Sequence, residues 1–259
     1  MQHSALVLLA LLLAHVLADF PLQTSRMVEG KGRRDITAFV SHLGMHLVAA
    51  ILCLFAFTDV PLMRSETGIV LLLLVTGHGL LDLAKSIVIE KSPRLDNWWM
   101  FLADQMLHVV ILLAVATILP EVTLELRALE RFWDMQRDRI LTEAFVITIF
   151  VFPTGYLIRY LLEPLSIRLK TSGEAPSTER GLANAGLYLG WVERSLLLYA
   201  FTEASITAVG LIVGAKSVVR FPEFQTRAFA EYFLLGSLLS VGVAAIGALA
   251  LTTARSLVS

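Results

Sequence analysis

The stretch LAHVLADFPLQ (residues 13–23) places His15 and Asp19 four residues apart, near the end of an apolar run. Four residues make about one helical turn, so the two side chains share one face of a helix. Three later apolar segments carry pairs with the same spacing: His42 with His46, His78 with Asp82, and Asp104 with His108. Ionisable groups inside membrane-length helices are costly and usually functional. Four such pairs on consecutive segments therefore predict one shared site, most simply a metal site.

The composition is that of an integral membrane protein of the all-α class. Of the 259 residues, 56% are hydrophobic and 17% are charged, and the mean hydropathy is +0.73. Soluble domains contain roughly 25% charged residues. The net charge of −1 gives no support for nucleic-acid binding. Cys53 is the only cysteine, so an internal disulfide is excluded and the predicted metal ligands must be nitrogen and oxygen.

The apolar segments predict a helix bundle with about eight transmembrane spans, since one span needs about 20 apolar residues. The expected spans cover about 4–20, 38–57, 68–89, 97–119, 141–162, 182–199, 201–218 and 228–253. Whether the sixth and seventh are separate spans stays open. Mixed charges at 121–140 predict an amphipathic surface helix that links a four-helix site-bearing domain (1–120) to a second helical membrane domain (141–259). The first segment also resembles a signal peptide, but no Lys or Arg precedes it.

The loop charges predict an orientation. Connections after the first, third, fifth and seventh spans hold 14 Lys and Arg residues, and the opposite side holds 6. The first set is therefore expected to be cytoplasmic. All four pairs then fall in one layer about 10 Å thick, toward the cytoplasmic side. This agreement in depth is the main argument from the residues for one shared site.

Imidazole and carboxylate ligands suit a divalent metal, with zinc the first choice and manganese or iron as alternatives. The expected ligands are His15, Asp19, His42, His46, His78, Asp82, Asp104 and His108. Asp82 or Asp104 could act as general base, and Lys85 could bind a phosphate or lipid head group near them. Gln23, Lys31 and Gln105 are expected to support the ligands. The predicted function is a metal-dependent hydrolase acting on a lipid-like or phosphorylated amphiphile in the bilayer.

Other interpretations stay open. Polar residues can simply join helices by hydrogen bonds, and Lys85 can be a positive anchor at the membrane surface. His/Asp relays can also carry protons or metal through a transporter or channel. A scaffold that docks a partner through the loop at 163–180 is a third reading, and homo-oligomerisation is undecided. In the second half, Glu193, Arg194 and Glu231 are interpreted as a structural polar lock between helices.

A family resemblance supports the grouping of these residues. The residues that carry it are His15, Asp19, Gln23, Lys31, His42, His78, Asp82, Lys85, Asp104, Gln105 and His108. Their pattern resembles the bacterial membrane family named domain of unknown function 3307. The resemblance covers about residues 5–115, and the remainder is similar to the extension of longer members. It implies a polytopic protein of the bacterial cytoplasmic membrane and does not identify a reaction.

Overall fold

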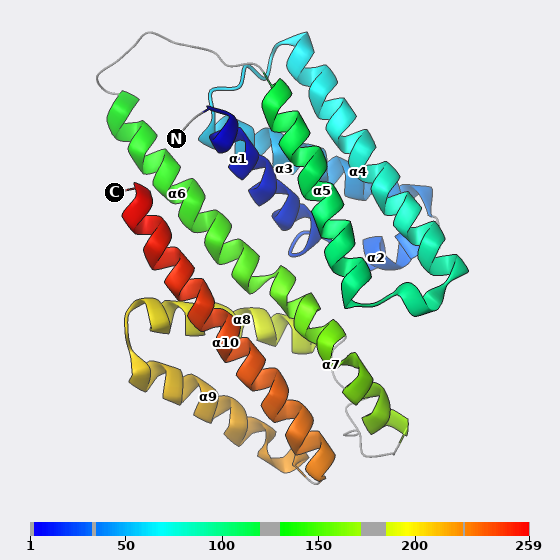
Figure 1. Cartoon of the computed structure of the whole chain (residues 1–259), viewed down its shortest axis with the longest axis vertical. Helices are drawn as coiled ribbons and strands as arrows, with labels where there is room; N and C mark the ends of the chain where they lie inside the picture. The colour runs from blue at the N-terminus through cyan, green and yellow to red at the C-terminus, as the bar shows by residue number, and fades with distance from the viewer. Residues whose placement is uncertain (1–2, 33–34, 120–129, 172–184, 225, 259) are drawn as a thin grey trace. The chain divides into compact units, whose positions relative to one another are not determined.

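The computed structural model describes residues 3–32, 35–119, 130–171, 185–224 and 226–258, in which all regular secondary structure is helical (Figure 1). The chain divides into two compact units. The first comprises Met1–Thr148 with Val258–Ser259, and the second comprises Ile149–Leu257. The predicted all-α class is confirmed.

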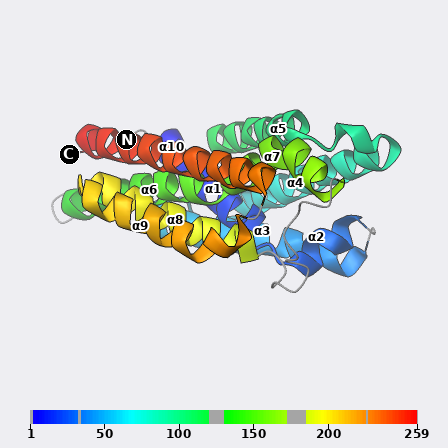
Figure 2. The ribbon, with the colours of Figure 1, turned by 90° about the horizontal axis from the view of Figure 1, so that it is seen from below.

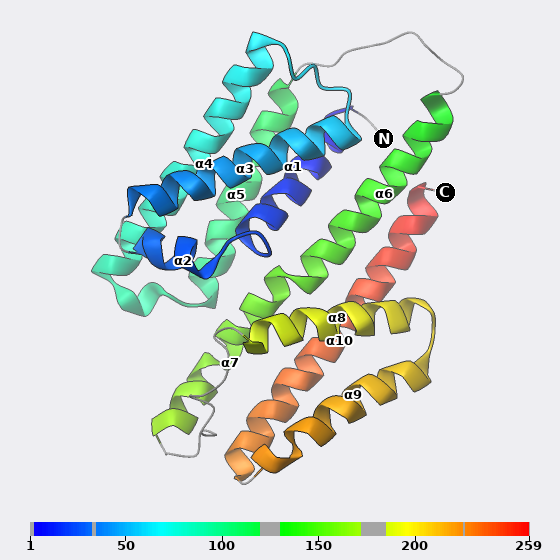
Figure 3. The same cartoon turned by 180° about the vertical axis from the view of Figure 1, so that it is seen from behind.

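The first unit is built around a closed four-helix arrangement. Helix α1 (His3–Asp19) packs against α3 (Ile36–Phe57) and α5 (Trp98–Ile118). Helix α4 (Ser65–Lys91) packs against the same two helices, and the short 3-10 helix η1 (Pro93–Leu95) leads from α4 to α5. Figures 1 and 3 show these four helices from opposite sides. Each helix therefore directs one face toward a common interior, where the apolar core includes Leu11, Leu54, Leu74 and Leu112.

Helix α2 (Ser25–Gly32) lies beside the first part of α3, as Figures 2 and 3 show. The approach is close, because a methyl group added to Gly30 would lie 2.3 Å from Cβ of Ala38. Only glycine fits that distance without moving a backbone. The packing of α2 on α3 holds the connection from the end of α1 close to the start of α3.

Two capping residues fix where α3 and α5 begin. The Asp35 side chain accepts hydrogen bonds from the backbone of Thr37 and Ala38, and Asn97 caps α5 in the same way. Such caps satisfy backbone N–H groups that have no partner within the helix. His42 and Asp104 each follow their cap by seven residues, which is about 10 Å along the helix. The two caps therefore set the depth of both side chains.

Five described helices are long and apolar enough to cross a membrane. They are α3, α4, α5, the stretch Gln136–Leu169 and most of α10. Helix α1 is apolar but shorter. Large apolar side chains point outward on the bundle, among them Phe55, Leu72 and Val110. This outer surface is consistent with insertion into a bilayer, whereas the expected number of eight spans is not confirmed.

The second unit contains α7 (Pro153–Thr171), α8 (Ala185–Thr202), α9 (Ile206–Arg220), the 3-10 helix η3 (Phe221–Glu223) and α10 (Arg227–Val258). Helices α8 and α9 form a hairpin, which Figure 3 shows, so the sixth and seventh apolar segments are separate helices. Ala204 adopts a φ of 51° in the turn between them. The fifth segment is divided, because α6 (Glu130–Val151) ends just before Pro153, whose nitrogen cannot donate a hydrogen bond.

The predicted linker at 121–140 is only partly described. Residues 120–129 lie outside the described residues, and from Glu130 the chain continues as α6. Arg137 forms two hydrogen bonds to the carboxylate of Asp59, of 3.0 and 3.1 Å, which join α6 to the turn between α3 and α4. The division at 121–140 stays a prediction. In the sequence, the boundary between the two compact units falls between residues 148 and 149.

Candidate metal centre

The structure brings all eight expected ligands together inside the four-helix bundle. Each helix contributes one pair: His15 and Asp19 from α1, His42 and His46 from α3, His78 and Asp82 from α4, and Asp104 and His108 from α5. We call these eight residues the His/Asp cluster. Seven of them are buried, and the side chain of Asp19 is 11% exposed. The close approach of α3 and α4 depends on Gly79, since a methyl group there would meet Leu43 at 3.1 Å.

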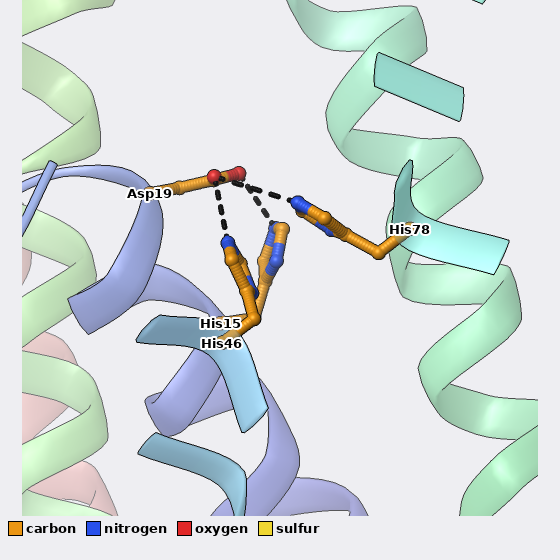
Figure 4. A group of neighbouring side chains, drawn as sticks. All are labelled: His15, Asp19, His46 and His78. Atoms are coloured by element: carbon orange, nitrogen blue, oxygen red, sulfur yellow. Dashed lines mark hydrogen bonds and ion pairs between the residues drawn. The ribbon is translucent and has the colours of Figure 1, made fainter. Parts of the chain in front are cut away.

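The carboxylate of Asp19 lies at the centre of one group of ligands (Figure 4). Its oxygens are 3.0 Å from Nε2 of His46, 3.5 Å from Nε2 of His15 and 3.8 Å from Nε2 of His78. Figure 4 shows the three rings directed at the carboxylate from α1, α3 and α4. Ligand atoms around tetrahedral zinc are about 3.3 Å apart, given metal–ligand bonds of about 2.0 Å. The spacing of these side chains therefore fits an ion among them.

His42 lies between two carboxylates. Its Nε2 is 3.2 Å from an oxygen of Asp19, 3.2 Å from an oxygen of Asp82 and 3.2 Å from Nε2 of His78. One ring nitrogen carries at most one proton, so it can donate to only one of these three atoms. The amide of Gln23 lies 3.2 Å from Nδ1 of His42 and orients the ring from its other side. The lone pairs of the other atoms therefore face Nε2 of His42 without a proton between them. A cation at this place would reduce the repulsion among these lone pairs.

A hydrogen bond fixes which nitrogen of the His108 ring carries the proton. Its Nδ1–H donates to the backbone carbonyl of Asp104 at 2.8 Å, which leaves the lone pair on Nε2. That Nε2 is 3.8 Å from an oxygen of Asp82. Among the described residues, Nε2 of His108 and Nε2 of His15 have no hydrogen-bond partner, although both atoms are buried. Buried polar atoms without partners are costly, and a bound metal would satisfy both.

Asp104 is supported by two neighbours. Lys85 Nζ donates to its Oδ2 at 2.8 Å, and Gln105 Nε2 donates to the same oxygen at 3.2 Å. Lys85 is partly exposed, at 28%, so its ammonium group lies at the edge of the cluster. The side chain of Lys31 lies outside the described residues. Of the three expected supporting residues, the structure thus places Gln23 and Gln105 against the ligands.

Three carboxylates of the cluster lie inside the bundle. Asp19, Asp82 and Asp104 have side chains at most 11% exposed, and Lys85 pairs with Asp104. Buried charges in proteins are paired or coordinate a metal ion, because leaving them in a medium of low dielectric constant is costly. A divalent cation among these carboxylates would stabilise all three.

A cavity adjoins the rings on the apolar side. Four histidines line it, namely His15, His46, His78 and His108, and its other walls are apolar side chains of all four helices. Two of these side chains are the small residues Ala14 and Ala50. The cavity has room for about one water molecule, next to the ring nitrogens of the cluster.

The three residues of the predicted polar lock in the second unit bind other partners rather than one another. Glu193 pairs with Lys216 on α9, and Arg194 Nε donates to the carbonyl of Val151 at 3.0 Å. Glu231 is exposed and pairs with Arg227 on its own helix, so the structure does not bring it to the other two. Lys216 is the partner that sequence reasoning missed. Its position in the sequence was the available signal. Glu193 and Lys216 lie 11 and 12 residues on either side of Ala204 in the turn, so a helical hairpin places them opposite each other.

Comparison with known proteins gives one match. Residues 7–135 match the model of a protein family described as "Protein of unknown function (DUF3307)". The matched region contains most of α1 and all of α2 to α5, and thus every member of the His/Asp cluster. No curated protein and no solved structure matches the chain.

Proposed function

We propose, for a chain that belongs through residues 7–135 to the DUF3307 family, that it is a membrane protein which binds divalent metal and hydrolyses a membrane-associated substrate. The family's function is unknown, so the proposal depends on the site itself. One observation carries it: buried imidazoles and carboxylates from four helices converge, and two of the ring nitrogens have no hydrogen-bond partner among the described residues. Imidazole and carboxylate together suit zinc, manganese or iron, and zinc is our first choice.

The chemistry of the surrounding groups favours hydrolysis. A bound divalent ion supplies a Lewis acid and an activated water near neutral pH. Asp82 or Asp104 can take a proton, because both carboxylates border the cluster and proton transfer needs only hydrogen-bond reach. Lys85 can bind an anionic group at the edge of the cluster, since its ammonium is partly exposed. The small cavity beside the rings has room for about one water molecule.

These features favour a lipid-like or phosphorylated amphiphile as substrate. Its polar group would meet the ligands and Lys85, and its apolar part would stay in the bilayer. We propose that the site faces the cytoplasmic side of a bacterial membrane, in line with the excess of Lys and Arg in the connections on that side. A homo-oligomer is compatible with this proposal.

A second candidate function is the transport of protons or metal ions. It is favoured by the close polar contacts of 3.2 Å that join Asp19 through His42 to Asp82. Series of carboxylates and histidines inside membrane helices carry protons in pumps. The two functions differ in their products. Transport predicts gradient-driven movement of zinc or protons into liposomes without cleavage of any substrate.

The first prediction concerns metal content. We expect the full chain, purified in detergent without chelator, to hold at least about one divalent ion, to lose it to a strong chelator and to regain it on addition of zinc. Elemental analysis of the protein fraction measures this directly. A preparation that retains no divalent metal after zinc is added, and remains folded by circular dichroism, contradicts the proposal.

The second prediction concerns Lys85. We expect Lys85→Met to lower the release of phosphate from phosphatidate in mixed micelles by about 100-fold, since a positioned charge at the reacting group is lost. Metal content should not fall, because Lys85 contacts Asp104 and is not itself a ligand. Lys91→Met, at the exposed end of the same helix, is the matched control and should keep full activity. Equal loss in both variants would show that Lys85 has no special role.

A further inference from the structure

We infer that the His/Asp cluster holds two divalent ions, bridged by the carboxylate of Asp82; this inference rests on the proposed function. Two of the groups of possible ligands have no member in common. The first group contains His15, Asp19, His46 and His78, and the second group contains Asp82, Asp104 and His108. A further group, His42, His78 and Asp82, shares His78 with the first and Asp82 with the second. Within each group the ligand atoms lie within 4.8 Å of one another. The first group thus offers four protein ligands and the second three, the numbers that bind structural and catalytic zinc ions.

Asp82 connects the two groups. Its Oδ2 lies 3.2 Å from Nε2 of His42 and 3.7 Å from Nε2 of His78, on the side of the first group. Its Oδ1 lies 3.8 Å from Nε2 of His108, on the side of the second group. One carboxylate therefore directs each of its oxygens at a different set of rings. This is the geometry of a carboxylate that bridges two ions.

The two groups are also close enough for a shared site. His42 and His78 both lie between Asp19 and Asp82, with Nε2–O distances from 3.2 to 3.8 Å. Only one layer of ring nitrogens thus separates the two carboxylates. Two-metal sites in hydrolases place their ions about 3.5–4 Å apart, and helix bundles build such sites from pairs on facing helices.

The unpartnered nitrogens support one ion in each group. His15 belongs to the first group and His108 to the second, and the Nε2 of each is buried without a hydrogen-bond partner among the described residues. A single ion in the first group would leave His108 unsatisfied. Two divalent ions would also add four positive charges to a cluster with three carboxylates, which favours an anionic group such as a phosphate monoester.

The experiment counts ions in matched variants of the full chain. After removal of metal and reloading with manganese, we expect about two ions in the unmodified protein and about one in either His15→Ala or His108→Ala. The double variant should hold none. His3→Ala is the control, because residue 3 lies about 18 Å along α1 from His15. His15→Gln and His108→Gln repeat the count with side chains closer to the native size.

Electron paramagnetic resonance then tests the bridge. Two bridged manganese ions should give a spin-coupled spectrum, and each single variant should give the six-line spectrum of an isolated ion. One ion in the unmodified protein, lost in both single variants, overturns the inference and leaves the proposed function intact. Two ions with uncoupled spectra overturn the bridge by Asp82. No bound ion in any form overturns the inference and the proposed function together.

Discussion

Asp19→Asn is expected to weaken metal binding by at least about 100-fold, because it removes the charge of a central ligand and keeps its shape. Asp19 lies within 3.0–3.8 Å of Nε2 atoms of four histidines, more than any other carboxylate of the cluster. An amide oxygen is a weaker ligand than a carboxylate, and the amide nitrogen cannot bind a cation. Competition with a chromophoric zinc chelator measures the affinity.

The same substitution should affect stability much more with metal than without it. With metal bound, a 100-fold weaker affinity removes about 2.7 kcal/mol of stabilisation at a fixed metal concentration. Without metal, the asparagine oxygen can still accept the hydrogen bond that Nε2 of His46 makes to Asp19 at 3.0 Å, so the stripped variant should unfold within a few degrees of the stripped native protein. Thermal unfolding in detergent measures both forms.

Asp59→Asn is the matched control for Asp19→Asn. Asp59 is exposed and pairs with Arg137 in the same unit, outside the cluster. It should lower stability by at most about 1 kcal/mol and leave metal affinity unchanged. If Asp19→Asn binds zinc as tightly as Asp59→Asn does, the carboxylate of Asp19 is no ligand. A stripped Asp19→Asn protein that is clearly less stable than stripped native protein would show a purely structural role.

Local sequence patterns were sufficient to predict which residues form the cluster. The spacing of four residues in each pair places both members on one helical face whatever the tertiary structure. Burial of that face follows because ionisable groups avoid lipid. The eight expected ligands therefore meet inside the bundle as the pattern indicates. The suspected family is confirmed by the match over residues 7–135.

Contacts between helices could not be read from the same patterns. The pairing of Lys85 with Asp104 depends on how α4 is rotated about its axis relative to α5. The distance between α3 and α4 depends on the close packing at Gly79. These are properties of side-chain packing between segments distant in sequence. The number of spans was also uncertain, because apolar length does not reveal that α6 ends at residue 151 before Pro153. Proline inside a long apolar segment was the available signal.

Asp82→Asn is expected to lower the rate of phosphate release by about 100- to 10,000-fold, the usual contribution of a general base. Its two oxygens face His42 and His108 on different sides of the cluster, and Lys85 follows it by less than one helical turn. Asp82 is thus placed to act on both metal and substrate. Release of phosphate from phosphatidate in mixed micelles, at saturating zinc, measures the effect.

Two further measurements separate the possible roles of Asp82. If it is the base, the residual rate of Asp82→Asn should rise with pH, because hydroxide replaces the lost proton acceptor, and the ion count should stay at the native value. If it is the bridge, the variant should lose an ion or its spin coupling, whatever the pH. Asp96→Asn, at an exposed position between α4 and α5, is the control and should hydrolyse at the native rate. A native rate in Asp82→Asn would exclude both roles, because an amide can neither accept the proton nor bridge two ions with equal strength.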